Sequence, residues 1–157
     1  MFPRIKHFLL QCFTYETSPH KLTIACALAT YIAFCPFVGV HTIMAIGLGF
    51  LLRLNVPFLL AIGWIINNPF TMIPVYMSGY LFGHFLLHSW WGVSIAGSNP
   101  WWMYSVNAFL QSSLGIKNIS FWAFMIGGNV LGIFFATLCY IVMLPVFVRL
   151  ASQQKAS

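Results

Sequence analysis

The side chains best suited to chemistry in this chain lie at two proline-containing interruptions of long apolar stretches. The first interruption divides the apolar run from Leu22 to Leu52, and its candidate binding residues are Pro36, Gly39, His41 and Thr42. Proline removes a backbone donor, and irregular backbone at membrane depth is tolerated only where protein or a water-filled cavity satisfies it. We therefore expect either an anion-binding helix N-terminus or a packed hairpin tip in which the histidine caps the backbone.

The second interruption lies in the apolar run from Phe58 to His88. Its candidate binding residues are Asn67, Asn68, Pro69 and Thr71. Two amides and a hydroxyl beside a helix break are suited to binding an ion or a polar head group. The same groups can instead satisfy the carbonyl oxygens that Pro69 leaves without a donor. Pro74 follows about one turn later, and we expect it to disturb the helix again.

The remaining polar residues give little sign of catalysis. His84 and His88 have a spacing compatible with one metal-binding helix face, but no acidic residue accompanies them as a third ligand. Glu16 is the only carboxylate residue, so an acid/base pair of carboxylates within one chain is excluded. We expect no enzyme activity, no catalytic residue, no metal site and no cofactor.

The composition is that of a membrane protein. Of the 157 residues, 61% are hydrophobic and 5% are charged, whereas soluble domains carry about 25% charged residues. Seven Lys and Arg residues oppose one acidic residue, and most of them flank apolar runs: Arg4, Lys6, Lys21, Arg53, Arg149 and Lys155. Such positions are typical of topology signals and of contacts with anionic lipid head groups. We therefore expect membrane lipids, and no nucleic acid, as partners.

The predicted architecture is all-α: a small polytopic helical membrane protein with proline-broken or re-entrant helices. Residues 1–20 read as an amphipathic segment lying along the membrane interface, and Ser18-Pro19 predicts the start of the next helix. Residues 21–150 form a single membrane domain, and 151–157 form a polar tail that we expect to fray. An aromatic stretch over 90–117 is predicted at the membrane surface opposite the N-terminus. The clearest spanning segment is 119–150, which contains a Gly128/Gly132 packing motif.

Helix lengths favour a re-entrant first segment. The arms Leu22–Cys35 and Thr42–Leu52 would be about 16–21 Å long as helices, shorter than a hydrocarbon core of about 30 Å. If both arms form a hairpin, Arg53 and both termini share the positive, cytoplasmic side of the membrane. The alternative is one long tilted helix kinked at Pro36, which would place Arg53 outside.

The stretches SPHKLTIACALATYIAFCPFVGVHT, LRLNVPFLLAIGWIINNPFT and YMSGYLFG resemble the bacterial membrane proteins grouped as domain of unknown function 2062. The matching positions are Pro19, Ala25, Ala29, Pro36, Gly39, His41, Arg53, Asn55, Asn68, Pro69, Thr71, Tyr80 and Gly83. The resemblance implies a bacterial inner-membrane protein, and some relatives are joined to glycosyltransferase-like domains. It implies no established reaction.

Two functional hypotheses follow. In the first, the protein transports or handles a lipid-linked or small anionic substrate of the cell envelope, as a homo-oligomer. The two interruptions then face each other, His41, Asn67, Asn68 and Thr71 contact a polar or phosphorylated head group, and Arg53 attracts an anionic group at the cytoplasmic mouth. In the second, the protein is a non-transporting scaffold or assembly partner of an envelope-synthesis enzyme, and the interruptions shape a packing surface.

Overall fold

Helices make up every regular element in the described part of the chain, which confirms the all-α prediction. The computed structural model describes residues 18–35, 40–90, 99–101, 104, 108, 112 and 120–155. Its elements are α2 (Pro19–Phe34), α3 (His41–Leu51), α4 (Val56–Ile66), α5 (Pro69–Phe85), the π-helix η1 (Leu86–Trp90) and α7 (Phe121–Lys155). The predicted interfacial segment, apart from residues 18–20, lies outside the described residues, as does most of the aromatic stretch.

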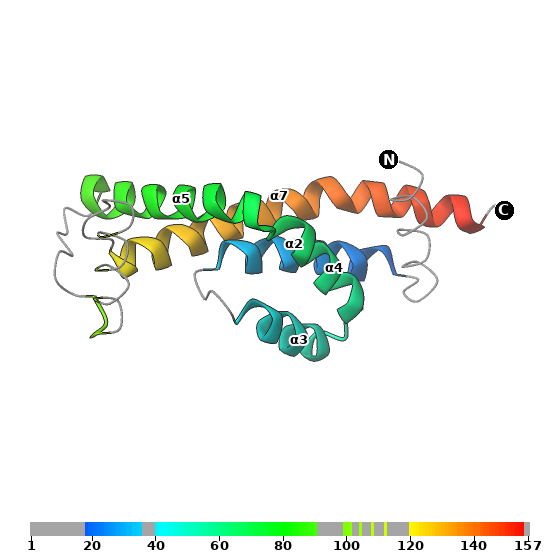
Figure 1. Cartoon of the computed structure of the whole chain (residues 1–157). Helices are drawn as coiled ribbons and strands as arrows, with labels where there is room; N and C mark the ends of the chain where they lie inside the picture. The colour runs from blue at the N-terminus through cyan, green and yellow to red at the C-terminus, as the bar shows by residue number, and fades with distance from the viewer. Residues whose placement is uncertain are drawn as a thin grey trace.

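The longest helix, α7, is the element on which α2 and α5 pack (Figure 1). It contains 35 residues and is therefore about 52 Å long. Contacts of α7 with α5 involve its first two turns, whereas α2 contacts it further along, through Tyr31 with Asn129 and His20 with Tyr140. Helix α4 packs on α2, and its Phe58 ring contacts Phe147 of α7. Helix α3 packs on α2 and α4 and is the helix set apart at the lower side of Figure 1.

The chain reverses direction between α2 and α3. Figure 1 shows these helices side by side and running in opposite directions, so one long helix kinked at Pro36 does not form. Helix α2, with 16 residues, is about 24 Å long, and α3, with 11 residues, is about 16 Å long. As predicted, α2 begins at Pro19, although the Ser18 hydroxyl makes no capping bond. Pro36 and Gly39, both predicted binding residues, lie in the connection outside the described residues.

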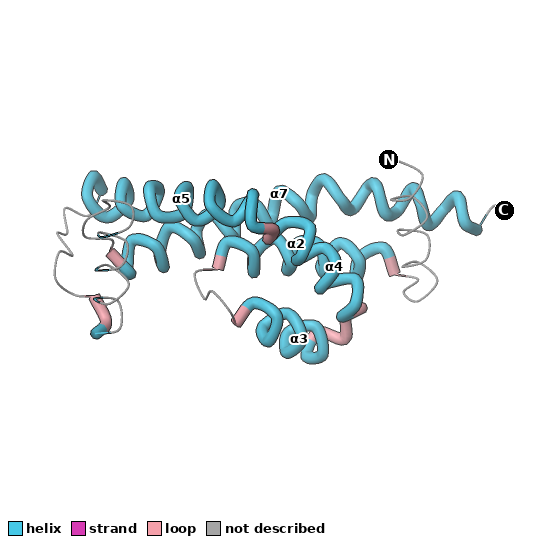
Figure 2. Tube along the Cα trace, viewed as in Figure 1, coloured by secondary structure: helices cyan, strands magenta, loops and turns pink. Residues whose placement is uncertain are grey.

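The second interruption lies where the sequence predicts it. Helix α4 ends at Ile66 and α5 begins at Pro69, and Figure 2 shows a short loop between them. The expected second disturbance at Pro74 is wrong, since α5 continues through this residue. A proline within a helix removes one backbone hydrogen bond, and here its exposed ring lies on the outer face. Helix α7 likewise continues through Pro145 and includes residues 151–155, which were predicted to fray.

Glycines bring α5 and α7 into backbone contact. A Cβ atom at Gly83 would overlap the Ala123 carbonyl, and one at Gly127 would overlap the Gly79 carbonyl. Small residues of this kind allow the close helix approach found in membranes. The predicted Gly128/Gly132 motif is divided between two neighbours, because Gly128 faces Gly79 on α5 whereas Gly132 faces Tyr31 and Phe34 on α2.

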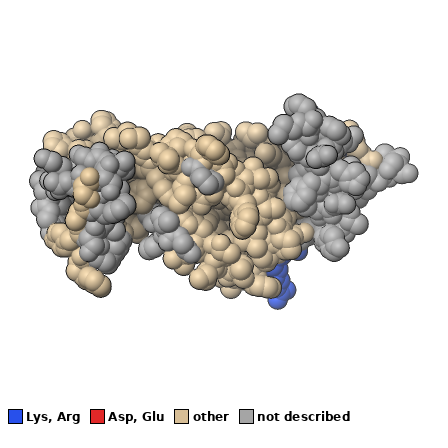
Figure 3. Space-filling model, viewed as in Figure 1, with Lys and Arg blue, Asp and Glu red and all other residues tan. Residues whose placement is uncertain are grey.

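Two helical stretches are long and apolar enough to cross a membrane, as judged from length and composition. They are Phe70–Ser89, with 20 residues, and Phe121–Gln153, with 33 residues. Large apolar side chains cover much of their outer faces, including Phe70, Ile73, Phe134 and Ile141. In the view of Figure 3, the described surface carries Lys or Arg atoms only near its lower edge.

Candidate functional site

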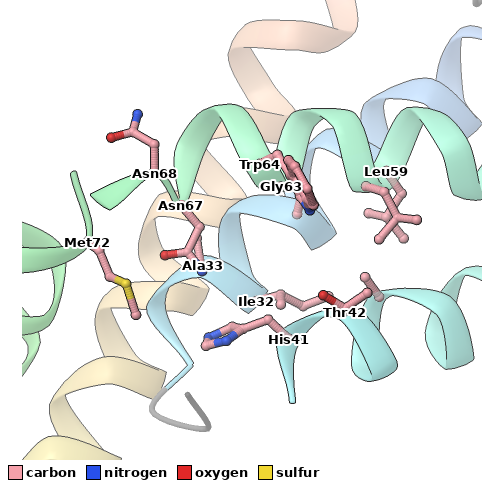
Figure 4. A pocket seen from close by; sticks show the side chains of 13 residues that line it. Ile32, Ala33, His41, Thr42, Leu59, Gly63, Trp64, Asn67, Asn68 and Met72 are labelled. Carbon is pink, nitrogen blue, oxygen red and sulfur yellow. The ribbon is translucent and has the colours of Figure 1, made fainter. Parts of the chain in front are cut away.

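A pocket of about 390 Å³ lies between α2, α3, α4 and the first turn of α5. Its polar lining residues are His41, Thr42, Asn67 and Asn68. The other lining residues are apolar and include Ile32, Leu59, Trp64 and Met72 (Figure 4). The two interruptions that the sequence singles out therefore meet at one pocket. A mostly apolar cavity with a few convergent polar groups is the usual form of a small-molecule site.

His41 closes the connection between α2 and α3. Its Nε2 atom lies 2.9 Å from the Cys35 carbonyl oxygen and 3.4 Å from the Tyr76 hydroxyl. Because a carbonyl can only accept, the short contact assigns the proton to Nε2 and leaves Nδ1 as an acceptor in the neutral ring. The imidazole also stacks on Tyr76, with ring centroids 6.4 Å apart. The histidine thus caps the backbone and lines the pocket at once, which combines the two expectations for this residue.

Asn67 ends α4 and turns its side chain into the pocket. Its backbone N–H donates to the Gly63 carbonyl at 2.8 Å, which fixes the residue at the helix end. In Figure 4 the amide nitrogen lies on the side of the His41 ring and the amide oxygen points away from the ring. The Oδ1 atom is buried and has no hydrogen-bond partner. Leaving a buried acceptor unpaired costs about 1–3 kcal/mol.

Asn68 and Thr71 form the cap of α5. The Asn68 Oδ1 atom accepts from the backbone N–H groups of Phe70 and Thr71, and the Thr71 hydroxyl accepts from the Asn68 N–H. Thr71 also donates to the Ile66 carbonyl, at the end of α4. Figure 4 shows the Asn68 amide pointing away from the pocket. Both residues were predicted to contact substrate, but the structure uses their polar atoms to begin a helix.

The other predicted residues are placed as follows. Thr42 lines the pocket and is exposed, and Pro69 is the first residue of α5, beside the pocket. Arg53 is exposed in the turn between α3 and α4 and does not line the pocket. Its φ angle of 52° places it in the left-handed region, where it completes the end of α3 together with a Leu54 N–H bond to the Gly49 carbonyl. Arg53 was predicted to attract an anionic group at the mouth of the site, but its positive charge is not part of the pocket lining.

Sequence reasoning missed four residues near the polar end of the site. Gly63 and Trp64 line the pocket from α4, Met72 lines it from α5, and Tyr76 contacts His41 from the next turn of α5. Helical spacing is the signal that points to them: Gly63 precedes Asn67 by four residues and Met72 follows Asn68 by four. A Cβ atom at Gly63 would meet nothing within 4 Å, so this glycine leaves space in the pocket.

The electrostatics of the pocket differ from those of an anion site. No Lys, Arg, Asp or Glu is among its lining residues. At the start of α5, the backbone N–H groups of Phe70 and Thr71 are already occupied by Asn68. The N-terminus of α5 is therefore occupied by its own cap, whereas the anion-binding helix N-terminus expected at the first interruption is that of α3, which has no side-chain cap. The polar side chains that remain at this end come from His41, Thr42 and Asn67.

Comparison with known families identifies the chain. The model of the family DUF2062, described as an uncharacterized protein conserved in bacteria, matches residues 3–156. The chain belongs to this family. No curated protein and no solved structure matches it. DUF2062 membership establishes a bacterial family and agrees with the resemblance seen in the sequence, while the family description names no reaction.

Proposed function

We propose that this DUF2062 protein is an integral membrane protein that binds an amphipathic lipid-like substrate in the pocket at its two helix interruptions. The membrane part of the proposal is supported by exposure. Core helices of soluble proteins are mostly buried, but only 17% of the Phe70–Ser89 window and 11% of the Phe121–Gln153 window are buried. The Phe70 side chain is 90% exposed. Apolar surfaces this large must be shielded from water, and a lipid bilayer would shield them.

The proposed topology follows the direction of the helices. Helices α2 and α3 form a re-entrant hairpin, α4 and α5 together cross the bilayer, and α7 crosses back. Lys21, Arg53 and Arg149 are all exposed, and they lie at the start of α2, the α3–α4 turn and the end of α7. Figure 1 shows these three places in the same half of the molecule. The positive-inside rule then puts this half, with both termini, at the cytoplasmic face of the bacterial inner membrane.

The binding part of the proposal is carried by the pocket itself. Its apolar walls suit a hydrocarbon chain, and its polar groups gather at the interruptions that join α2 to α3 and α4 to α5. A volume of about 390 Å³ lies within the usual range of ligand pockets, about 300–1,000 Å³. Since no cationic side chain lines it, the pocket favours a lipid-like substrate over a small free anion. The proposed role is binding and movement of substrate, with no catalytic step.

Cysteine accessibility tests the topology. Single cysteines replace Arg53, Ser89 and Gln153 in a background without the native cysteines, and a membrane-impermeant thiol reagent is applied to intact cells. We expect only the Ser89→Cys variant to be labelled, with labelling of the other two after the membrane is opened. Labelling of the Arg53 position in intact cells would show that α2 and α3 cross the membrane, and the hairpin would be wrong.

A matched glycine pair tests the pocket. Gly63 lines the pocket and Gly47 does not, yet a Cβ atom meets nothing within 4 Å at either position. The Gly63→Leu variant should fill the pocket and the Gly47→Leu variant should not, with similar effects on folding. Native mass spectrometry of protein extracted in mild detergent then measures co-purifying lipid. We expect lipid to be lost from the Gly63→Leu variant alone.

The same pair separates the scaffold hypothesis from substrate binding. If the protein only provides a packing surface for an envelope-synthesis enzyme, filling an internal pocket should change nothing. Equal lipid retention by both variants, or none by the wild-type protein, would therefore refute the binding proposal.

A further inference from the structure

The C-terminal end of α5 carries a pair of histidines that takes no part in the pocket. His84 lies in the last turn of α5 and His88 lies in η1, and both residues are exposed. Their ring centroids are 5.8 Å apart and their planes are nearly parallel, with an interplanar angle of 19°. The Tyr80 ring lies 6.0 Å from His84, one turn earlier on the same helix. The two imidazoles are therefore neighbours on one helix face.

The change from α-helix to π-helix helps to align the two rings. Residues four apart on an α-helix are neighbours, although the second is rotated about 40° past the first. A π-helix bonds residue i to residue i+5, so it rotates less for each residue. Because η1 begins at Leu86, between the two histidines, the excess rotation is reduced and His88 lies more nearly in line with His84. Single π turns within α-helices occur frequently at functional sites.

The separation of the rings suits a shared metal ion. A tetrahedral ion about 2.1 Å from one nitrogen of each ring places the ring centroids about 5 Å apart. The observed 5.8 Å is only slightly longer, and small rotations of two exposed side chains close the difference. Neither imidazole makes a hydrogen bond to another described residue, so binding a metal ion breaks no bond of this kind.

The described surroundings of the pair contain no cation that would repel a metal ion. The Lys and Arg residues within the described helices and turns lie at the start of α2, in the α3–α4 turn and at the end of α7. Figure 1 shows these places in the half of the molecule away from the C-terminal end of α5. Glu16 is the only carboxylate residue of the chain, so the imidazoles are the ligands that this end of the molecule offers.

We infer that His84 and His88 bind one divalent transition-metal ion, with Cu²⁺ preferred. Imidazole suits copper, zinc and nickel, and a nitrogen site generally binds Cu²⁺ most tightly among these divalent ions. No group of three or more His, Cys, Asp or Glu side chains comes together in the described part of the chain, so water completes the coordination. The prediction of no metal site required a third protein ligand, and an open site of two imidazoles does not. This inference is independent of the lipid pocket.

Titration calorimetry with CuCl₂ tests the site, using wild-type protein purified in detergent without a polyhistidine tag. We expect one Cu²⁺ ion per chain. Either His84→Gln or His88→Gln should lower the affinity about tenfold or more, because the second imidazole is held at a high effective concentration beside the first. His20→Gln is the matched control, since it removes the histidine that contacts Tyr140 on α7, and it should leave the affinity unchanged. Ca²⁺ prefers oxygen ligands and should not displace Cu²⁺.

Electron paramagnetic resonance of the wild-type copper complex gives a second measurement that needs no variant. Two nitrogen ligands are expected in the spectrum, and fewer than two would refute the pair as the site. Absence of Cu²⁺ binding by the wild-type protein would overturn the inference. So would an unchanged affinity in His84→Gln or His88→Gln, or an equal loss in His20→Gln.

Discussion

Replacing Asn68 by alanine should destabilise the protein, because this residue holds two helix ends together. Its Oδ1 atom accepts from the N–H groups of Phe70 and Thr71 at 2.9 and 3.1 Å. Its Nδ2 atom donates to the Ile65 carbonyl at 3.2 Å. These bonds satisfy donors at the start of α5 and an acceptor at the end of α4. Inside a bilayer, no water is available to replace them.

The expected loss of stability can be worked out from these bonds. Removing an N-cap side chain costs about 0.5–2 kcal/mol, with about 1 kcal/mol as the usual value. Losing the bond to the Ile65 carbonyl adds about 0.5–1.5 kcal/mol. The Asn68→Ala variant should therefore lose about 1–3.5 kcal/mol in total, with about 2 kcal/mol as the central value. The Asn68→Ser variant keeps a capping oxygen and should lose less than about 1 kcal/mol.

Unfolding by sodium dodecyl sulfate, followed by tryptophan fluorescence in detergent, measures the free energy of unfolding. Asn67→Ala is the matched control, since it makes the same substitution one residue earlier and removes an oxygen that has no partner. We expect this control to lose less stability than the Asn68→Ala variant. If Asn68→Ala and Asn67→Ala lose equal stability, or if Asn68→Ser is as unstable as Asn68→Ala, the capping assignment is wrong.

Three further substitutions test the packing of the helices, each by the same unfolding measurement. Gly83→Ala should lose about 1–3 kcal/mol of stability, because its methyl group overlaps the Ala123 carbonyl. Gly47→Ala places its methyl group in open space and should gain about 0.5–1 kcal/mol. Equal effects of the two substitutions would argue against backbone contact between α5 and α7. Arg53→Gly should gain up to about 1 kcal/mol of stability, because glycine adopts the left-handed conformation at this position without strain. Arg53→Ala should give no gain. If both variants gain stability, the cause is the removal of the positive charge and not the backbone conformation. Tyr31→Phe removes the 2.7 Å bond to Asn129 and should lose about 0.6 kcal/mol. Asn129→Ala also removes a bond to the Met125 carbonyl, so it should lose more, and the double variant should lose less than the sum of the two single losses. Additive losses would contradict a direct bond between Tyr31 and Asn129.

Much of the fold could be predicted because interruptions of apolar helices have local causes. The start of α2 at Pro19 and the break between α4 and α5 follow from prolines and from a side chain able to cap the new helix. Pro74 shows the limit of this reasoning. No capping residue precedes it as Asn68 precedes Pro69, so the chain continues as a helix and loses one hydrogen bond. A proline alone therefore did not predict a break, whereas a proline together with a cap did.

The different roles of Asn67 and Asn68 in the site could not be predicted from the sequence. Asn67 and Asn68 are neighbours of the same type, and both were predicted to contact substrate. Asn67 is the last residue of one helix and Asn68 precedes the first residue of the next, so their backbone angles send their side chains in different directions. The absence of Arg53 from the pocket likewise depends on how α3 and α4 pack, which local patterns do not encode.

The unpaired oxygen of Asn67 is best understood against the other polar groups at the two interruptions. His41 satisfies the Cys35 carbonyl, Asn68 satisfies the Ile65 carbonyl, and Thr71 satisfies the Ile66 carbonyl. Loose packing would leave orphaned atoms at several of these places. Within the described residues, the one orphaned side-chain atom instead belongs to a residue that lines the pocket. The described side chains at the two interruptions therefore satisfy carbonyl oxygens at the ends of α2 and α4, so the breaks are held together by hydrogen bonds of their own residues.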